Sequence, residues 1–594
     1  MRHLPEVWDL DSIYDGGAES PRMLADLQRA EQMCQKLLGL LEKRFEGAVS
    51  RHGLKRVILE YSDARMLLEQ LDSYVGCLMA QDTADRAAAA PDGRISAALG
   101  LLEAAAVRIG FRLLSLDEGE MEEMLRDSEL QGIRYAVVSM RRAAARRMDA
   151  DRESLASSLA VDGYHGWSRM YDTLVGELRI EFSQEGELRS VSAGQACNLM
   201  RSPSRQLRKS VFKGWEEAWS DRGEAFAQVL NRLAGFRLAL YREREWESLL
   251  EETLEANRAS RATLDAMWGA VEKATPLMAA FLQARAERLG LPGLSWFDLD
   301  APLPGEAQSL SLEEAARLVT ATFEEFSPKM GTFAREAIEA GWVESQDRDN
   351  KAPGAFCTDF PVLGQSRVFT TFGGDLSSAA TLAHELGHAW HGRALRSWPY
   401  LARLYPMTLA ETASTFAERL VSSAAMRRAE TASARLAVAD DMAREAVGLL
   451  MNIRARFLFE TRFYAVRTNE GPLPADRLSR LMEEAQREAY GESLCGYHPL
   501  FWCSKLHFYD TTEPFYNWPY TFGFLFSMGV WAQSQAHGES FEERYLRLLQ
   551  DTGSMSVEDL AEKHLEADIT RQPFWNQAIR QALAPVEEAT RLLS

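Results

Sequence analysis

The segment His384-Glu-Leu-Gly-His388 places two histidines four residues apart, with a glutamate directly after the first. Residues 377–395 favour a helix, and on a helix positions four apart lie one turn above each other on one face. Both imidazoles can therefore bind one metal ion, and zinc is the metal typical of this spacing. Glu385 lies about 100° round the helix from His384. Its carboxylate can therefore reach a water molecule at the metal and act as a general base.

A catalytic zinc site needs a third protein ligand and one open position. The pattern with a third histidine six residues after the second is excluded, because position 394 is Ala394. A second predicted helix beginning at Met407 offers Glu411 and Glu418, two turns apart on one face. A carboxylate from a following helix usually completes such a site, so both glutamates are candidates.

The elements that must position these residues are mostly helical. Residues 23–147 show apolar positions at intervals of three and four among charges, which predicts long amphipathic helices. The alternating run 178–182 predicts a short strand, and Ser311-Leu-Glu-Glu314 has the form of a helix-starting capping box. Short apolar runs between glycines at 352–374 predict a small sheet that leads into the motif helix. We expect a boundary between two lobes near residue 200.

The composition narrows the classes of partner and compartment. A chain of 594 residues with a formal net charge of −20 is large enough for two lobes and repels nucleic acid. Six widely spaced cysteines without a CxxC pair, and a start that lacks a secretory signal, favour a reducing, cytoplasmic location. The most apolar stretch, 522–531, is too short to span a bilayer and predicts a buried core helix, so no membrane partner is expected.

Two further histidines lie outside the motif. His391, three residues beyond His388, shares the motif face and is expected near the substrate or behind the metal ligands, not as a ligand itself. His498, beside Pro499, is expected to be a solvent-exposed loop histidine.

The motif and several distant segments together resemble a known family. The run His384–His391, followed by Glu411 within Ala-Glu-Thr-Ala-Ser, resembles the M3 metallopeptidases, and within them the oligoendopeptidase F branch. Other segments similar to that branch are Val7-Trp-Asp-Leu-Asp-Ser-Ile-Tyr, Ser202-Pro-Ser-Arg-Gln-Leu-Arg-Lys, Lys351-Ala-Pro-Gly-Ala-Phe-Cys and 507–520. The resemblance therefore extends over nearly the whole chain.

The resemblance implies a mainly α-helical, two-lobed molecule with a long substrate channel and zinc on its wall. We assign residues 1–200 to an N-terminal helical lobe and residues 201–594 to the catalytic lobe. The resemblance also implies that Glu411 is the third zinc ligand. It implies that His507, Tyr516 and Tyr520 are catalytic, as donors to the substrate and the oxyanion. Related enzymes often carry a further tyrosine where this chain has Gly523-Phe-Leu525.

The function expected from these residues is hydrolysis of internal bonds in short oligopeptides, with one zinc per chain and Glu385 as base. A carboxydipeptidase or other exopeptidase on the same scaffold is an alternative that the motif does not exclude. A non-catalytic peptide-binding protein is a third hypothesis, and Glu385 argues against it because a structural metal site has no use for a base. The sequence does not indicate an oligomeric state.

Overall fold

The computed structural model describes residues 4–43, 51–304, 309–538 and 541–594. The chain packs into two compact units, each built from three segments. The first unit comprises Met1–Ala150, Gln308–Ala425 and Gln533–Glu566, and the second comprises Asp151–Ala307, Met426–Ala532 and Ala567–Ser594. These segments do not coincide with a boundary at residue 200, and the assignment of 1–200 and 201–594 to two functional lobes stays a prediction.

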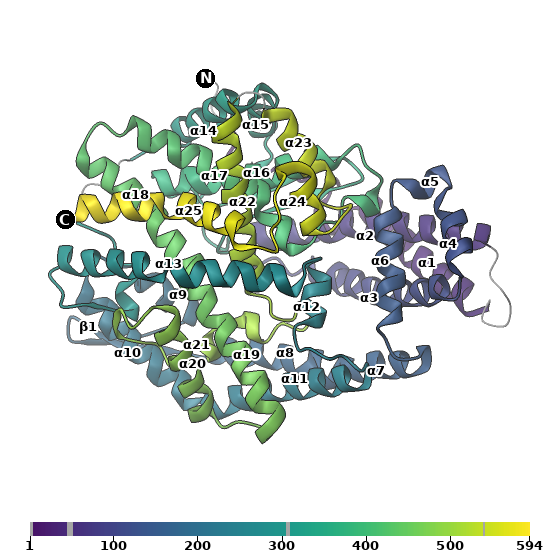
Figure 1. The fold of residues 1–594 in the computed structure, drawn as a ribbon, viewed down its shortest axis with the longest axis horizontal. Helices are drawn as coiled ribbons and strands as arrows, with labels where there is room; N and C mark the ends of the chain where they lie inside the picture. The colour runs from purple at the N-terminus through teal and green to yellow at the C-terminus, as the bar shows by residue number, and fades with distance from the viewer. Residues whose placement is uncertain (1–3, 44–50, 305–308, 539–540) are drawn as a thin grey trace. The chain divides into compact units, whose positions relative to one another are not determined.

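Helices dominate both units, which confirms the predicted mainly α class (Figure 1). Those of the first unit are α1 (Pro21–Lys43), α2 (Arg51–Gln81), α3 (Ala89–Leu114), α4 (Glu118–Leu125), α5 (Ser128–Gln131), α6 (Arg134–Ala145), α14 (Leu312–Phe326), α15 (Pro328–Glu339), α16 (Leu376–Leu395), most of α17 (Met407–Arg428), α23 (Phe541–Asp551) and α24 (Val557–Leu565). Those of the second unit are α8 (His165–Glu177), α9 (Ala193–Leu199), α10 (Arg205–Asp221), α11 (Gly223–Glu243), α12 (Glu251–Ala256), α13 (Arg261–Arg288), α18 (Ala432–Val447), α19 (Ile453–Glu470), α20 (Ala475–Ala489), α21 (Phe501–Ser504), α25 (Gln572–Leu593) and most of α7 (Ala150–Gly163) and α22 (Trp518–His537).

The metal-motif helix of the first unit rests on a small sheet, as the sequence predicts. Strands β4 (Val343–Glu344), β5 (Phe356–Phe360) and β6 (Gln365–Phe369) have the order β4-β6-β5. Strand β6 runs parallel to β4 and antiparallel to β5, with Phe356 opposite Phe369. Both β5 and β6 contact α16. The sheet therefore packs against α16 and supports it. Strand β5 lies at one edge of this sheet.

Local signals explain where the site helices begin. The Asp375 carboxylate accepts a hydrogen bond from the N–H of Ser378 and caps α16, which satisfies a donor that the first turn leaves free. The predicted capping box at Ser311 is confirmed at the start of α14, where Ser311 and Glu314 bond each other's N–H groups. Helices α14, α15 and α23 then pack around α16.

The remainder of the first unit is the predicted set of long amphipathic helices. Helices α1, α2, α3 and α6 bury one continuous apolar core, which extends to Phe360 and Phe369 of the sheet. The opening segment of the chain joins this core, because the indole N–H of Trp8 donates to the Val368 carbonyl of β6 at 2.9 Å. The N-terminal helices and the site sheet therefore form one packed body.

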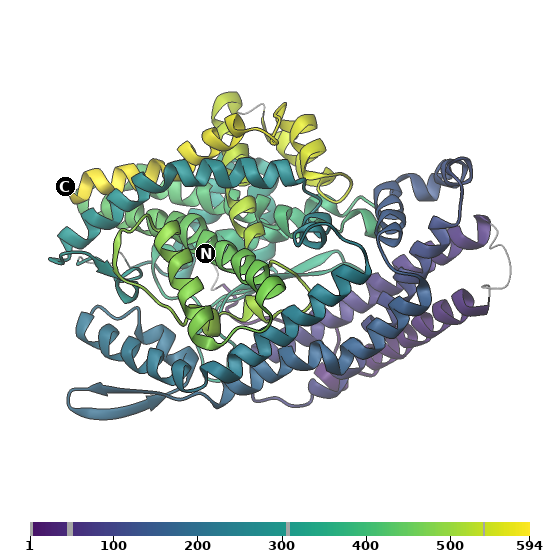
Figure 2. The ribbon, with the colours of Figure 1, turned by 60° about the horizontal axis from the view of Figure 1, so that its bottom comes forward.

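The second unit is organised around helix pairs. Helix α25 packs on α13 and α18, and α19 packs on α20 and α11. The short strand predicted at 178–182 is present as β1 (Ile180–Gln184), which pairs antiparallel with β2 (Glu187–Val191) in a hairpin beside α10 (Figure 2). Parallel pairing of β3 (Leu294–Ser295) with β7 (Leu494–Gly496) forms a second small sheet.

Residues 522–531 are buried within α22 as expected, and among the described residues we find no helix suited to crossing a membrane. All six cysteines are free. The expectation for His498 was wrong: it is only 3% exposed, accepts a hydrogen bond from the Trp215 indole and lies against the Glu216 carboxylate. Its partners lie on α10, far away in the sequence, so its neighbour Pro499 carried no information about burial.

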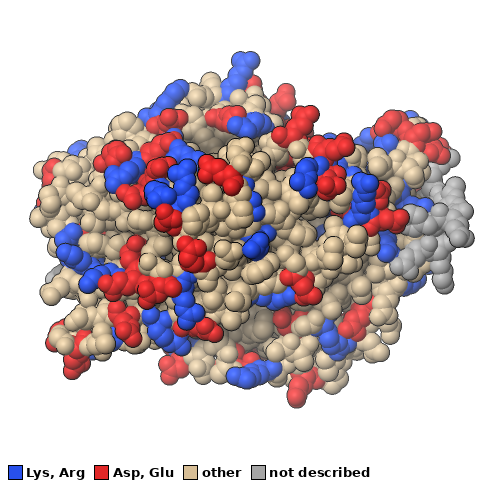
Figure 3. All heavy atoms as spheres, turned by 90° about the horizontal axis from the view of Figure 1, so that it is seen from below, with Lys and Arg blue, Asp and Glu red and all other residues tan. Residues whose placement is uncertain are grey.

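The formal charge of −20 does not gather into one region of the visible surface. Figure 3 shows acidic and basic side chains interspersed over the face that it draws. Ion pairs also join neighbouring helices, as between Lys36 and Glu60 and between Arg335 and Glu324.

Helices α16 and α17 approach each other closely at Gly387. A Cβ atom at this position would lie 2.7 Å from the carbonyl oxygen of Ala413 and 2.8 Å from the Cβ of Ala417. Real Cβ atoms do not approach backbone atoms so closely, so only glycine permits this crossing. The middle residue of the histidine motif therefore determines how near α17 comes.

We predict that Gly387→Ala destabilises the protein, because the added methyl must push α17 away, at a cost of about 1–3 kcal/mol. The measurement is the free energy of unfolding in denaturant. Gly100→Ala is the matched control, since Gly100 is an exposed glycine within α3 where an added Cβ would meet open space. That variant should gain up to about 1 kcal/mol from reduced backbone freedom. Equal stabilities of the two variants would contradict the close approach.

Candidate metal centre

Two imidazoles and one carboxylate converge within the first unit. His384 and His388 lie one turn apart on α16, with ring centroids 5.0 Å apart. Glu411 Oε2, from the first turns of α17, lies 3.2 Å from His384 Nε2 and 3.5 Å from His388 Nε2. One possible ligand atom from each residue lies within 4.8 Å of the others. The three residues predicted from the sequence are therefore brought together, and they could hold a metal ion.

Glu418 contacts the opposite side of one imidazole. Its Oε2 lies 2.9 Å from His384 Nδ1, whereas Glu411 faces Nε2 of the same ring. A carboxylate at Nδ1 favours the tautomer with the proton on that nitrogen, which leaves the Nε2 lone pair free for a metal. The two glutamates that the sequence left as alternatives thus occupy different positions around His384.

The Glu411 carboxylate is held in its charged form. Burial alone would raise its pKa, but the hydrogen bond with His384 and the nearby His388 lower the pKa to about 2. The Ser414 hydroxyl also donates to Glu411 Oε2, at 2.7 Å. A fixed carboxylate anion is what a cation at this point requires.

The two imidazoles differ in their electrostatic surroundings. Burial lowers the pKa of His388 to about 4. Burial also opposes a charge on His384, but its hydrogen bonds with Glu411 and Glu418 raise the pKa of His384 well above the ordinary value. A proton on His384 provides the positive charge that these carboxylates attract, and a bound cation can provide it instead.

Glu385 is buried beside these groups, at 5% exposure. Burial raises the pKa of its carboxyl to about 7. Its Oε2 is buried and has no hydrogen-bond partner. A buried polar atom without a partner costs free energy, and in a native site it indicates a place for a water molecule, an ion or a substrate.

A cavity of about 380 Å³ is lined by His384, His388 and Glu411, the metal group, and by Glu385. Strand β5 contributes Phe356, Cys357 and Asp359 to its wall, and Tyr405 contributes from the loop before α17. Sequence reasoning did not find Asp359 or Tyr405, because neither belongs to a motif with metal-ligand spacing. The cavity gives a substrate access to the metal group.

His391 is buried on the motif helix and contacts Thr552 and Tyr405. Its ring is fully buried, with Nε2 2.9 Å from the Thr552 hydroxyl, and it stacks on Tyr405 with ring centroids 4.2 Å apart. Burial lowers its pKa to about 3. A neutral imidazole packed in this way supports α16 and the wall of the cavity.

His507, Tyr516 and Tyr520 belong to the second unit, where they form a cluster of their own. The His507 ring centroid lies 4.9 Å from that of Tyr516 and 6.0 Å from that of Tyr520. Burial, aided by the charges of Arg456 and Lys505, lowers the pKa of His507 to about 4, so its imidazole is neutral near pH 7. The structure brings these three predicted residues together, and their catalytic role stays a prediction.

Comparison with known proteins agrees with the motif and the fold. The family model described as peptidase family M3 matches residues 198–579, and one described as oligopeptidase F matches residues 112–180. Oligopeptidase PepF of Bacillus subtilis is 21% identical over 460 residues, which cover 76% of this chain and 68% of the relative. A plasmid-borne oligoendopeptidase F of Lactococcus lactis is 21% identical over 390 residues, covering 64% of this chain and 63% of the relative. The aligned stretches thus span about two thirds of these relatives.

The fold is also shared with solved structures. The crystal structure of oligoendopeptidase-F from Enterococcus faecium superposes with a TM-score of 0.71 at 18% identity, covering 96% of this chain and 98% of that one. The family model for peptidase family M3 matches more than half of this chain. The residues of this chain that are expected to bind metal converge in the first unit. The chain therefore belongs to peptidase family M3 and is a metallopeptidase.

Proposed function

We propose that this chain is a zinc-dependent endopeptidase that hydrolyses internal bonds of short oligopeptides. The observation that carries the proposal is the convergence of two Nε2 atoms and the Glu411 carboxylate beside the buried, unpartnered oxygen of Glu385. Two imidazoles and one carboxylate are a donor set of catalytic zinc sites. The names of the relatives, oligopeptidase and oligoendopeptidase, support short peptides as the substrates.

In this proposal His384, His388 and Glu411 hold one zinc ion per chain, and Glu418 orients His384 through Nδ1. When bound, zinc supplies a Lewis acid that polarises the scissile carbonyl and makes a nearby water molecule more acidic. Glu385 takes a proton from the attacking water and returns it to the leaving amine. A base whose pKa is raised toward 7 by burial is matched to both transfers.

The remaining parts of the proposal concern the substrate and the compartment. Strand β5 lies at the edge of its sheet and lines the metal cavity, so its free edge can pair with an extended peptide backbone. Backbone pairing tolerates many side chains, which suits a peptidase of short, varied peptides. His507, Tyr516 and Tyr520 act as donors to the substrate and the oxyanion. The six free cysteines support a reducing, cytoplasmic location.

The two glutamates of α17 should differ in their effect on zinc affinity. Glu411→Gln removes a ligand and should abolish tight zinc binding. Glu418→Gln replaces the charged partner of His384 Nδ1 with a neutral amide and should weaken affinity by about 10- to 100-fold. Competition with a chromophoric chelator measures both, with Glu339→Gln on the exposed face of α15 as the unchanged control. A larger loss in Glu418→Gln than in Glu411→Gln would make Glu418 the ligand.

Glu385→Gln should keep zinc and fold but lower kcat by about 10²-fold or more, because the amide cannot accept the proton. The substrate is a peptide blocked at both termini, and the products are identified by mass spectrometry. Internal cleavage by the wild type supports an endopeptidase. Cleavage only of the peptide with a free C-terminus would favour the carboxydipeptidase alternative, and full activity of Glu385→Gln would contradict the base.

If His507, Tyr516 and Tyr520 stabilise the oxyanion, their replacement should act on the chemical step. We expect His507→Ala, Tyr516→Phe and Tyr520→Phe to lower kcat more than they raise KM. Steady-state kinetics and thermal unfolding are measured together. A loss of stability with unchanged kcat would assign these side chains to packing alone.

A further inference from the structure

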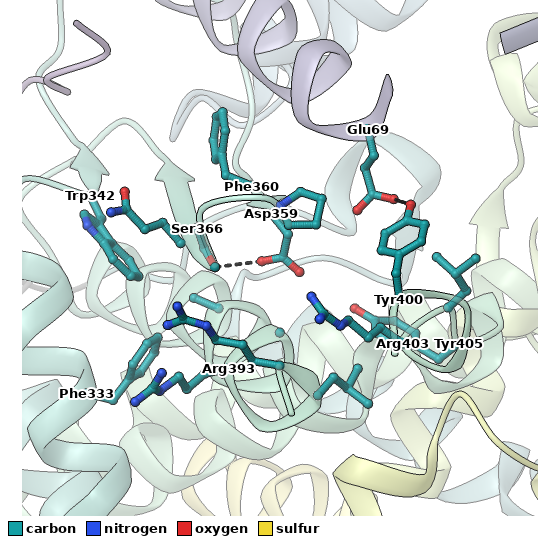
Figure 4. A pocket seen from close by; sticks show the side chains of 18 of the residues that line it. Glu69, Phe333, Trp342, Asp359, Phe360, Ser366, Arg393, Tyr400, Arg403 and Tyr405 are labelled. Atoms are coloured by element: carbon teal, nitrogen blue, oxygen red, sulfur yellow. Dashed lines mark hydrogen bonds between the residues drawn. The ribbon is translucent and has the colours of Figure 1, made fainter. Parts of the chain in front are cut away.

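The first unit contains a second cavity, of about 250 Å³, next to the metal cavity (Figure 4). Asp359 and Tyr405 line both cavities, so the two share part of a wall. Ala389, Gly392 and Arg393 of the motif helix α16 also line the second cavity. None of the chemistry proposed above uses this space.

Arginines dominate the polar lining of this cavity, and they are Arg65, Arg393, Arg396 and Arg403. Arg65 donates to the Tyr61 hydroxyl at 3.1 Å, and Arg403 donates through Nε to the Trp398 carbonyl at 2.8 Å. Within the described part of the chain, no ion pair joins any of the four to a carboxylate. Arg65, Arg393 and Arg396 are also exposed, so much of their N–H donor capacity faces solvent or the cavity.

Two carboxylates also line the cavity, but hydroxyl groups bind them instead of the arginines. Ser366 donates to Asp359 Oδ1 at 2.7 Å, and Tyr400 donates to Glu69. Four guanidinium groups against two carboxylates leave an excess of positive charge in the cavity. Figure 4 shows Asp359, Arg393 and Arg403 extending into the same space.

Glycines hold two of these charged groups close to the backbone. A Cβ on Gly364, where φ is +63°, would lie 2.2 Å from Nε of Arg396. A Cβ on Gly392 of α16 would lie 2.5 Å from Asp359 Oδ2. The guanidinium and the carboxylate thus lie directly against the main chain at these two glycines.

Four guanidinium groups share this cavity with only two carboxylates, and the repulsion between like charges is strongest where water is partly excluded. Burial lowers the pKa of Arg403, and Arg396 also lowers it, although Tyr400 and the two carboxylates act in the opposite direction. An anion among these guanidinium groups would remove the repulsion. From this excess of guanidinium groups without ion pairs around one cavity, we propose that the cavity binds a small oxyanion.

The chemistry of the lining narrows the class of ligand. Guanidinium groups bind phosphate and carboxylate through paired N–H donors. Phe333, Trp342 and Phe360 form apolar walls that can accommodate an organic portion. The same site therefore accepts either free inorganic phosphate or the terminal carboxylate of a peptide. This site is independent of the proposed peptidase reaction.

The test is isothermal titration calorimetry of the full-length, metal-loaded protein at low ionic strength. One arm uses inorganic phosphate, and the other compares the dipeptide Gly-Gly with its C-terminal amide. We expect one site per chain, and the double variant Arg393→Gln/Arg396→Gln should weaken binding by at least about tenfold. Both arginines are exposed, so the fold should survive, which thermal unfolding checks. Asp359→Asn should tighten binding because it removes a repelling charge.

The control Arg335→Gln removes an exposed arginine of α15 outside the cavity and should leave binding unchanged. Binding of phosphate but not of Gly-Gly would identify inorganic phosphate as the ligand. Binding of Gly-Gly but not of its amide would identify the terminal carboxylate of a peptide. The titration is repeated after metal removal, and binding should persist. Binding that disappears with the metal, binding unaffected by the double variant, or no binding of either probe at millimolar concentration would overturn the proposal.

Discussion

The convergence of His384, His388 and Glu411 depends on how closely helices α16 and α17 can approach each other. Donors on α16 and α17 must reach one point, and imidazole and glutamate side chains bridge only a short gap. At Gly387 the backbone of α17 comes so near that a methyl group would collide with it. The sheet beneath α16 and the helices α14, α15 and α23 around it hold this crossing in place. Loss of the close approach would separate Glu411 from both histidines while leaving every ligand residue present.

Burial gives these side chains their chemical properties and also makes the group costly to assemble. Three carboxylates, Glu385, Glu411 and Glu418, gather around two imidazoles at a partly enclosed position. Hydrogen bonds hold Glu411 ionised, whereas burial without a hydrogen-bond partner raises the pKa of Glu385. The proposed base on α16 and the proposed ligand on α17 thus have pKa values shifted in opposite directions, which is the separation of roles that acid–base catalysis needs. A cation at the two Nε2 atoms would balance the local charge.

Features that depend on neighbouring residues could be predicted from the sequence, whereas contacts between segments far apart in the chain could not. The convergence of His384 and His388 was predictable, because helix geometry alone places residues four apart on one face. Sequence spacing could not separate Glu411 from Glu418, since both lie on one face of α17, and the choice depends on the crossing at Gly387. Asp359 and Tyr405 reach the cavity only through tertiary packing. His498 was misjudged for the same reason, because its partners come from α10.

The central claim is that His384, His388 and Glu411 hold a catalytic zinc ion while Glu418 supports His384 from behind. Crystals of the zinc-loaded protein, measured on both sides of the zinc absorption edge, test it most directly. The account predicts one anomalous peak per chain at about 2.0–2.2 Å from Nε2 of both histidines and from a Glu411 oxygen. Glu418 should remain hydrogen-bonded to His384 Nδ1, outside the coordination sphere. A peak ligated by Glu418, or no peak at this group in an active enzyme, would contradict the account.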